Sequence, residues 1–559
     1  MPTGRSVLRG AVVGQKRHVG GASLLASAHQ GGEALVPVII GLVIDQAVTT
    51  GAADALLRWL AVLAAVFIAL SFSYRFASRA AERASEQAAH RLRLDVTERV
   101  LDPRGGTEAG RLPGALVNIA TGDAKRVGAV NGVLPFAVAG LAGLLVSAVA
   151  LLRISVPLGL LVLLGTPPLL WLTHVVGRPL ERRSGVEQER VAHASGVAAD
   201  LVSGLRVLKG IGAEAAAVAR YRRTSRDSLA ATLRAARAHA GHDGAILALT
   251  GIFIALVALV GANLAASGDI TVGQLVAAVG LAQFLLTPFQ IFAWVNGQIA
   301  QGRASAERIA SVLAAAPAVV PGSATLPAPA AGRIRLRGVT HGSLRGLDLD
   351  VAAGELLGVV TTDPAAATQL LECLGREADP AEGSVELDGI PLPELALDDL
   401  RGAVLVAAHD ADLFEGSLLD NVVAGAARAN VDRALVASAA DEVAETLPQG
   451  TRTVLAERGR SLSGGQRQRV ALARALAANP PVLAVHDPTT AVDAVTEARI
   501  AGELREIRQG RTTILVTTSP ALLAVTDRVV LLGGGTVSAE GTHAELVHAD
   551  EDYRTAVLT

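Results

Sequence analysis

A short polar run in the C-terminal part of the chain has residue types that suit contact with phosphate. It reads Ser463-Gly464-Gly465-Gln466 and leads into a segment rich in alanine and arginine. Glycines let backbone N–H groups approach a bound anion closely, and a helix that starts here would direct the positive end of its dipole toward that anion. The alternative interpretation is a glycine-rich turn before an ordinary surface helix.

The neighbours of this run extend the pattern. The run and the helix after it resemble the signature motif of ATP-binding cassette (ABC) transporters, and residues 457–459 resemble the end of the X-loop of exporters in that family. Residues 489–493 are similar to the family's D-loop, with Asp493 in place. In such proteins each ATP lies between the P-loop of one chain and the signature of the other. The resemblance therefore implies that Ser463–Gln466 and Asp493 act on an ATP carried by a partner chain.

The chain's own phosphate loop departs from the family pattern. A P-loop needs glycine-rich backbone around the phosphates, a lysine for the β- and γ-phosphates, and a Ser or Thr for magnesium. Ala367 stands at the lysine position, and no lysine follows Lys209. Pro364 removes an N–H donor, Asp363 adds negative charge, and only Thr368 keeps a hydroxyl that could bind Mg²⁺. The loop comprises Thr361, Thr362, Asp363, Pro364, Ala365, Ala366, Ala367 and Thr368.

The second acidic motif and three further positions also differ. A buried strand should end in Asp-Glu, which would hold magnesium and polarise the attacking water, but this chain has His486-Asp487. Imidazole is a poor ligand for a hard cation, and Asp487 is one methylene too short for the expected general base. By alignment to the family, His409 replaces the Q-loop glutamine, Thr518 the switch histidine, and Ser343 the aromatic residue that stacks on adenine.

These departures all fall on the chain's own nucleotide pocket, whereas the parts presented to a partner are intact. The resemblance then implies one half of a heterodimeric exporter with one competent and one degenerate site. ATP and Mg²⁺ would bind mainly at the site borne by a second half-transporter with intact Walker A and B motifs. A decaying pseudo-transporter is the alternative, and it predicts damage to the signature as well.

Composition places much of the chain in a membrane. Of 559 residues, 51% are hydrophobic and only 18% are charged, and the mean hydropathy of +0.43 is too high for an ordinary soluble protein. The formal net charge of −2 implies no nucleic-acid partner, and the single Cys373 excludes an intramolecular disulfide.

Six apolar stretches could span a lipid bilayer, which takes ~20 residues each. The long connections 75–126 and 178–237 are rich in arginine, whereas the short ones are nearly free of Lys and Arg. The positive-inside rule puts the long connections and both termini in the cytoplasm, in a multi-pass protein of the cytoplasmic membrane. The stretches are Ala22–Ile44, Leu56–Tyr74, Val127–Leu152, Ile154–Gly177, Gly244–Gly268 and Ile270–Gly302.

The pattern divides the chain into three parts. Residues 1–313 are expected to form a membrane α-helical bundle of six helices with long cytoplasmic extensions. Residues 314–331 are rich in Ala and Pro and indicate a linker. Residues 332–559 alternate short apolar runs and turns, which predicts an α/β nucleotide-binding domain of the P-loop NTPase type.

Two ionisable residues in the first stretch are candidates for substrate contact. His29 and Glu33 are four residues apart, hence on one helix face, and ionisable groups inside a membrane are often functional. Alternatively, both lie below the bilayer and face water. The resemblance implies ATP-driven export of a hydrophobic or amphipathic small molecule, lipid or peptide. A siderophore-like importer and a non-hydrolysing regulatory or channel subunit are the other interpretations.

Overall fold

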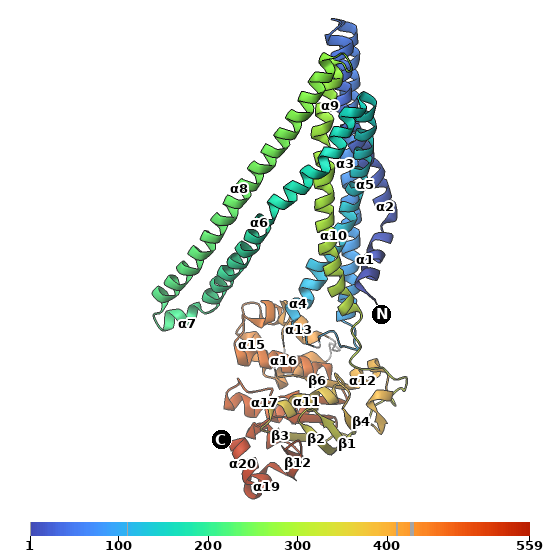
Figure 1. Ribbon diagram of the computed structural model, residues 1–559. Helices are drawn as coiled ribbons and strands as arrows, with labels where there is room; N and C mark the ends of the chain where they lie inside the picture. Colours follow the sequence, from blue (N-terminus) through green and yellow to red (C-terminus); the bar gives the residue numbers. More distant parts are fainter. Residues whose placement is uncertain (1, 109, 410–411, 425–429, 559) are drawn as a thin grey trace. The chain divides into compact units, whose positions relative to one another are not determined.

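The structure is a computed structural model that describes residues 2–108, 110–409, 412–424 and 430–558. The chain divides into two compact units (Figure 1). The first unit comprises Met1–Arg99 and Leu112–Ala314. The second comprises Val100–Arg111 and Ala315–Thr559, so a short segment after the third helix packs with the C-terminal unit.

The first unit is built from long helices. Two of them, α6 and α8, lie side by side and are joined through the short helix α7 (Figure 1). The helices are α1 (Gly4–Val13), α2 (Lys16–Val43), α3 (Ala53–Val100), α4 (Pro113–Asn118), α5 (Ala124–Ile154), α6 (Val156–Ser203), α7 (Leu205–Gly210), α8 (Glu214–Ala266), α9 (Val272–Phe284) and α10 (Leu286–Leu313).

The described residues contain 5 helical segments long and apolar enough to cross a membrane. The remaining predicted stretch falls on α6, where the apolar part Val156–Leu172 is shorter. The helices also continue well beyond the predicted stretches, as expected for membrane helices with cytoplasmic extensions. The five segments are Lys16–Val48, Ala53–Val100, Pro113–Ile154, Glu214–Ala266 and Val272–Leu313.

Two π-helical turns carry carboxylates that join distant helices. In the turn Ile44–Val48, Asp45 accepts hydrogen bonds from the Thr271 hydroxyl at 2.5 Å and the Gly273 N–H at 2.9 Å, at the start of α9. In the turn Ile119–Asp123, the fully buried Asp123 accepts from the Arg308 guanidinium at 2.6 and 2.7 Å. Each carboxylate therefore fixes the position of one helix against another within this unit.

The second unit contains two main sheets. A 4-stranded sheet has the order β2-β1-β4-β5, and a 6-stranded sheet has the order β12-β11-β3-β10-β9-β6. All neighbours in the larger sheet are parallel except β12 with β11. Strands such as β10 are buried on both faces, because helices cover parallel sheets on each side.

The strands are β1 (Ile334–His341), β2 (Leu344–Val351), β3 (Leu356–Thr361), β4 (Glu382–Leu387), β5 (Ile390–Pro391), β6 (Val404–Ala407), β7 (Gly416–Ser417), β8 (Val454–Leu455), β9 (Val482–His486), β10 (Thr512–Val516), β11 (Arg528–Gly533) and β12 (Thr536–Gly541). The helices are α11 (Pro364–Leu374), α12 (Leu397–Ala403), α13 (Leu418–Val423), α14 (Val431–Ala437), α15 (Ala440–Glu445), α16 (Gly464–Ala478), α17 (Ala494–Ile507), α18 (Pro520–Leu523), α19 (His543–Ala549) and α20 (Glu551–Leu558).

The segment predicted as a linker, 314–331, packs along this second unit. Val319 is buried, and the Arg376 guanidinium donates to the Val320 carbonyl at 2.6 Å. Ala324 forms an isolated parallel bridge with Leu395. The segment is therefore held by side-chain and backbone contacts along part of its length.

Candidate functional site

The predicted pocket residues meet at one edge of the larger sheet. Strands β3, β10, β9 and β6 are parallel neighbours, so their carboxyl ends share that edge. Thr361 ends β3, Thr518 follows β10, His486 ends β9 and His409 follows β6. Ligands of such sheets bind in the crevice outside the carboxyl ends of the strands. The structure therefore brings these candidates together, although they are far apart in the sequence.

The phosphate loop carries its own anion. Asp363 is the N-cap of α11, and its carboxylate accepts a hydrogen bond from the Ala365 N–H at 2.9 Å. The Asp363 N–H donates to the Thr361 hydroxyl at 3.2 Å. Pro364 follows at the first helical position and has no N–H to offer. The helix N-terminus that would hold phosphate is therefore occupied by a side chain of the loop itself.

The remaining loop residues do not supply what a nucleotide needs. Ala366 and Ala367 are 2% and 3% exposed and belong to the hydrophobic core beneath the sheet. The Thr368 hydroxyl donates to the Pro364 carbonyl at 3.0 Å, one turn back on its own helix. Thr362 and Thr368 are exposed. The loop thus offers hydroxyl oxygens but no cation for the phosphates.

The position expected to stack on adenine is tied to α11. The Ser343 N–H and hydroxyl both donate to Gln369 Oε1, at 2.6 and 2.8 Å. At the neighbouring Gly342 an added Cβ would lie 2.0 Å from the Gln369 amide nitrogen. Gln369 therefore packs beside Ser343, whose own side chain offers no aromatic surface.

His486 and Asp487 occupy the end of β9. His486 Nε2 lies 3.8 Å from a carboxylate oxygen of Asp487, and the rings of His486 and His409 are 5.7 Å apart between centroids. Burial lowers the pKa of the His486 imidazole, while Asp487 raises it and His409 lowers it further. A largely neutral imidazole therefore stands where an ionised carboxylate would hold magnesium.

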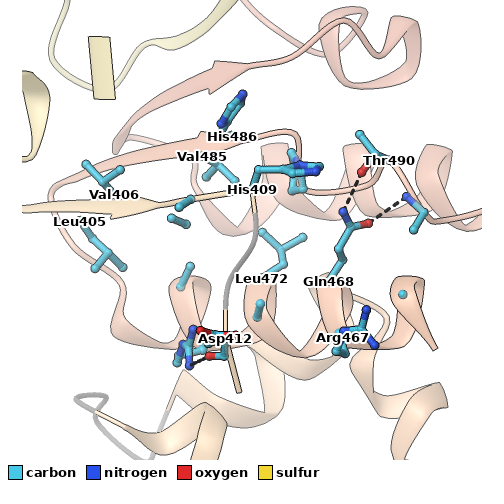
Figure 2. A pocket seen from close by; sticks show the side chains of 18 of the residues that line it. Leu405, Val406, His409, Asp412, Arg467, Gln468, Leu472, Val485, His486 and Thr490 are labelled. Carbon is cyan, nitrogen blue, oxygen red and sulfur yellow. Dashed lines mark hydrogen bonds between the residues drawn. The ribbon is translucent and has the colours of Figure 1, made fainter. Parts of the chain in front are cut away.

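A cavity of about 1000 Å³ opens between this sheet edge and α16. Figure 2 shows His409 and His486 on one wall and the α16 residues Arg467, Gln468 and Leu472 on the other. The residues described as lining it do not include the phosphate loop, Thr361–Thr368. This cavity thus lies beside the expected nucleotide position and not within it.

The signature run forms the capped start of a helix. Ser463 is the N-cap of α16, and the Ser463 N–H donates to Gln466 Oε1 at 2.8 Å. The Gln466 N–H donates to the Ser463 hydroxyl at 3.3 Å, which completes a capping box. A Cβ added at Gly465 would lie 2.4 Å from the Ala491 carbonyl oxygen, so only glycine fits. Gly464 is half-buried beside the same residue.

Asp493 has a related geometry at the end of the D-loop. It is the N-cap of α17 and accepts from the Thr496 N–H at 3.0 Å. Hydrogen bonds from the Thr496 backbone are the main reason that the pKa of the Asp493 carboxyl is lowered. Asp493 is exposed and ionised at neutral pH.

The two membrane candidates lie together. His29 Nδ1 is 2.9 Å from the Leu70 carbonyl oxygen, and its Nε2 is 3.8 Å from a Glu33 carboxylate oxygen. The imidazole also packs against Tyr74 at 5.2 Å between ring centroids. The Glu33 side chain is 45% exposed in the isolated chain. The pair therefore joins α2 to α3 and leaves one carboxylate accessible.

Sequence reasoning missed three features of this site. The cap at Asp363 has a signal in the Asp-Pro pair, which is typical of a helix start. Gln369 gave no signal, because its partner Ser343 is 26 residues away. Gln468 lies within the signature stretch and Glu497 just after the D-loop, but the sequence did not show that both contact the D-loop.

Comparison with known proteins agrees with this architecture. Residues 21–289 match the ABC transporter transmembrane region, and residues 344–490 match the ABC transporter family. A multidrug efflux ATP-binding/permease protein of Mycobacterium bovis is 33% identical over 531 residues, covering 93% of this chain but only 44% of that protein. An ATP-dependent lipid A-core flippase of Thiobacillus denitrificans is 30% identical over 407 residues, 71% of this chain and 70% of that protein.

A solved structure of a bacterial Atm1-family ABC exporter with ATP bound shares the fold, with a TM-score of 0.77 and 24% identity over 97% of both chains. The chain belongs to the ABC transporter family. Its fold is that of an ABC exporter with fused transmembrane and nucleotide-binding domains, which confirms the predicted fold class, and it is a multi-pass membrane protein.

An ABC domain implies ATP and Mg²⁺, but the residues of this chain's own pocket do not fit them. The phosphate position carries the Asp363 carboxylate, Ala367 is buried in the core, and the end of β9 offers an imidazole. The signature turn does fit phosphate, because glycine backbone and a helix N-terminus stand there without a carboxylate cap.

Proposed function

We propose that the chain is the degenerate-site half of a heterodimeric, ATP-driven ABC exporter in the cytoplasmic membrane. The observation that carries this proposal is the contrast between its two helix starts. At α11 a carboxylate caps the helix and the lysine position is a buried alanine, whereas at α16 a hydroxyl and glycines form the cap. A chain with these features would act on nucleotide only through a partner.

The partner in this proposal is a second half-transporter with an intact P-loop lysine and Asp-Glu pair. It would hold ATP and Mg²⁺, and Ser463–Gln466 of this chain would close over the γ-phosphate. The mycobacterial relative supports the need for a second half, because the segment aligned with this chain is only 44% of its length. ATP binding would then pair the two nucleotide-binding domains.

The cargo in this proposal is a hydrophobic or amphipathic small molecule, lipid or peptide. Support comes from the relatives, which are named for multidrug efflux and for flipping of lipid A-core. We place both termini in the cytoplasm, since the arginine-rich connections belong on that side. His29 and Glu33 would face the transport path through the exposed Glu33 carboxylate.

The test is ATP hydrolysis by the chain with and without its partner, each reconstituted in lipid nanodiscs. The chain alone should release no phosphate from Mg-ATP above the level of its Gly464→Asp variant, which serves as the background control. The co-expressed pair should be active. Turnover of the isolated chain at about 1 per second, the low end for enzymes, with loss in the variant, would overturn the degenerate-site proposal.

A further inference from the structure

The D-loop of this chain, residues 489–493, is hydrogen-bonded to the signature helix. Gln468 Nε2 donates to the Thr490 hydroxyl at 2.7 Å, and the Ala491 N–H donates to Gln468 Oε1 at 2.9 Å. Figure 2 shows both bonds leaving one amide. One side chain of α16 therefore fixes two consecutive residues of the loop, one through its side chain and one through its backbone.

The other side of the same loop is bonded to the switch segment. Glu497, on α17, accepts hydrogen bonds from the hydroxyls of Thr489 at 2.5 Å and Ser519 at 2.8 Å through one carboxylate oxygen. Thr489 is only 3% exposed. Ser519 follows directly after the switch position, Thr518, and caps the next helix through the Leu522 N–H at 3.3 Å.

Backbone contacts leave the loop little freedom between these two anchors. The Val492 N–H donates to the Thr489 carbonyl at 2.9 Å, which closes a tight turn. Gly465 packs so closely on the Ala491 carbonyl that any larger residue there would collide with it. The signature helix, the D-loop and the switch segment therefore form one connected body within the nucleotide-binding domain.

We propose that Glu497 and Gln468 are positioning residues that hold the D-loop, and through it the signature turn, in place for the partner's ATP when this chain's own pocket holds no nucleotide. This inference rests on the proposed function. Thr518, at the switch position, is exposed. The switch segment is instead held through the next residue, because the Ser519 hydroxyl donates to Glu497.

The first measurement is amide hydrogen exchange of the peptide covering the D-loop, residues 489–493, in the full-length chain paired with its partner in nanodiscs. Glu497→Ala should speed exchange about tenfold, because the loop loses a cap on one side and opens locally. In Glu497→Gln the amide protons of the D-loop should exchange at the wild-type rate, since the side-chain amide oxygen can still accept from the Thr489 and Ser519 hydroxyls. Glu506→Ala, an exposed glutamate at the end of α17, is the matched control and should change nothing.

The second measurement separates kcat from KM for the ATPase of the same complex. Glu497→Ala should lower kcat by about tenfold, because misplacement of a contacting group costs transition-state stabilisation. KM for ATP should stay within about twofold, because the partner's P-loop binds the ground state. Gln468→Leu should act in the same way, and Gln468→Glu should restore most of the activity, because a carboxylate accepts from both Thr490 and Ala491.

Thr489→Val, which keeps the shape of the side chain, covers the case in which Glu497→Ala does not fold, and it should show the same faster exchange. The positioning role would be overturned if Glu497→Ala kept the wild-type exchange rate and kcat. It would also be overturned if Glu497→Gln changed both quantities as much as Glu497→Ala does. Failure of the proposed function is distinguishable, because it would appear as an active complex with Gly464→Asp, whatever the exchange data show.

Discussion

The starts of α11 and α16 are both helix N-termini in one domain, and they are used in opposite ways. At α16 the cap is the neutral Ser463 hydroxyl, and glycine backbone leaves the helix dipole available to an outside anion. At α11 the Asp363 carboxylate already neutralises the dipole. The comparison teaches that a helix start in the right place is not enough for phosphate, because the charge of its cap decides whether an anion is attracted or repelled.

The residues that follow each cap also differ in whether they leave backbone open to a phosphate. Gly465 has no room for a side chain because the D-loop carbonyl of Ala491 lies against it. Ala366 and Ala367 instead pack into the core, and Ala367 stands where the family resemblance implies a lysine. The α11 loop therefore presents a carboxylate and buried methyl groups, whereas the α16 turn presents a hydroxyl and glycine backbone.

The largest effect is expected at the signature. Gly464→Asp in the paired transporter should lower ATPase turnover by ~100-fold or more, because it crowds the donors of the turn and adds a carboxylate where the γ-phosphate approaches. The measurement is steady-state phosphate release by the purified complex. Gly502→Asp is the matched control, since Gly502 lies on α17 with open space around it.

Full activity in Gly464→Asp would contradict the comparison, because the α16 turn would then be no more involved in hydrolysis than α11. Equal loss in Gly502→Asp would point to a general effect of added charge on folding. Both outcomes can be read from the same assay, provided that the variants are purified with equal amounts of partner.

A smaller effect is expected at the cap of α11, and it concerns stability. Asp363→Ala removes a helix cap, which costs about 1 kcal/mol, and should lower the Tm of this domain by about 2–4 °C. Asp363→Asn should retain most of the stability, because asparagine caps equally well. ATPase of the complex should be unchanged in both, and a large loss in either would show that this loop takes part in turnover.

Thr368→Ala should have a smaller effect still. The Thr368 hydroxyl bonds to the Pro364 carbonyl on its own helix, so the change removes one exposed local contact. Turnover of the complex should stay within about twofold of wild type. If Thr368→Ala silenced the complex while Gly464→Asp left it active, the intact and degenerate halves would have been assigned the wrong way round.

The sequence predicted those parts of the structure that depend on periodicity and on motif order. The predicted stretch Val127–Leu152 lies within α5, Ala124–Ile154, because a helix satisfies every backbone hydrogen bond of an apolar run within the segment itself. The resemblance assigned the pocket candidates to one nucleotide site, and the structure brings them to one sheet edge because parallel strands align their carboxyl ends.

Contacts between distant residues could not be predicted in this way. Asp123 and Arg308 are 185 residues apart, and neither lies in a recognised motif. The contact of Ser343 with Gln369 depends on how β2 and α11 approach one another, which hydropathy does not report. The position of Glu497 between Thr489 and Ser519 likewise follows from tertiary packing, so the sequence indicated the D-loop without indicating what holds it.

The smallest effect is expected for Asp487→Glu, which restores the general base by residue type alone. Asp487 has a φ of +43°, a left-handed conformation that aspartate adopts more readily than most residues. Its N–H donates to the Val516 carbonyl at 3.0 Å, which keeps the backbone in this conformation.

A glutamate at 487 would therefore not simply extend toward a phosphate, and the site would still lack a lysine at 367 and carry His486 in place of a magnesium ligand. The isolated Asp487→Glu chain should hydrolyse Mg-ATP no faster than wild type in the same nanodisc assay. Asp487→Asn, which lacks a base altogether, is the matched control and should give the same background. Robust ATP turnover in the isolated Asp487→Glu chain would mean that the pocket at α11 holds nucleotide despite the Asp363 cap. The length of the side chain at position 487 would then explain the inactivity of this pocket, and the contrast between the two helix starts would not.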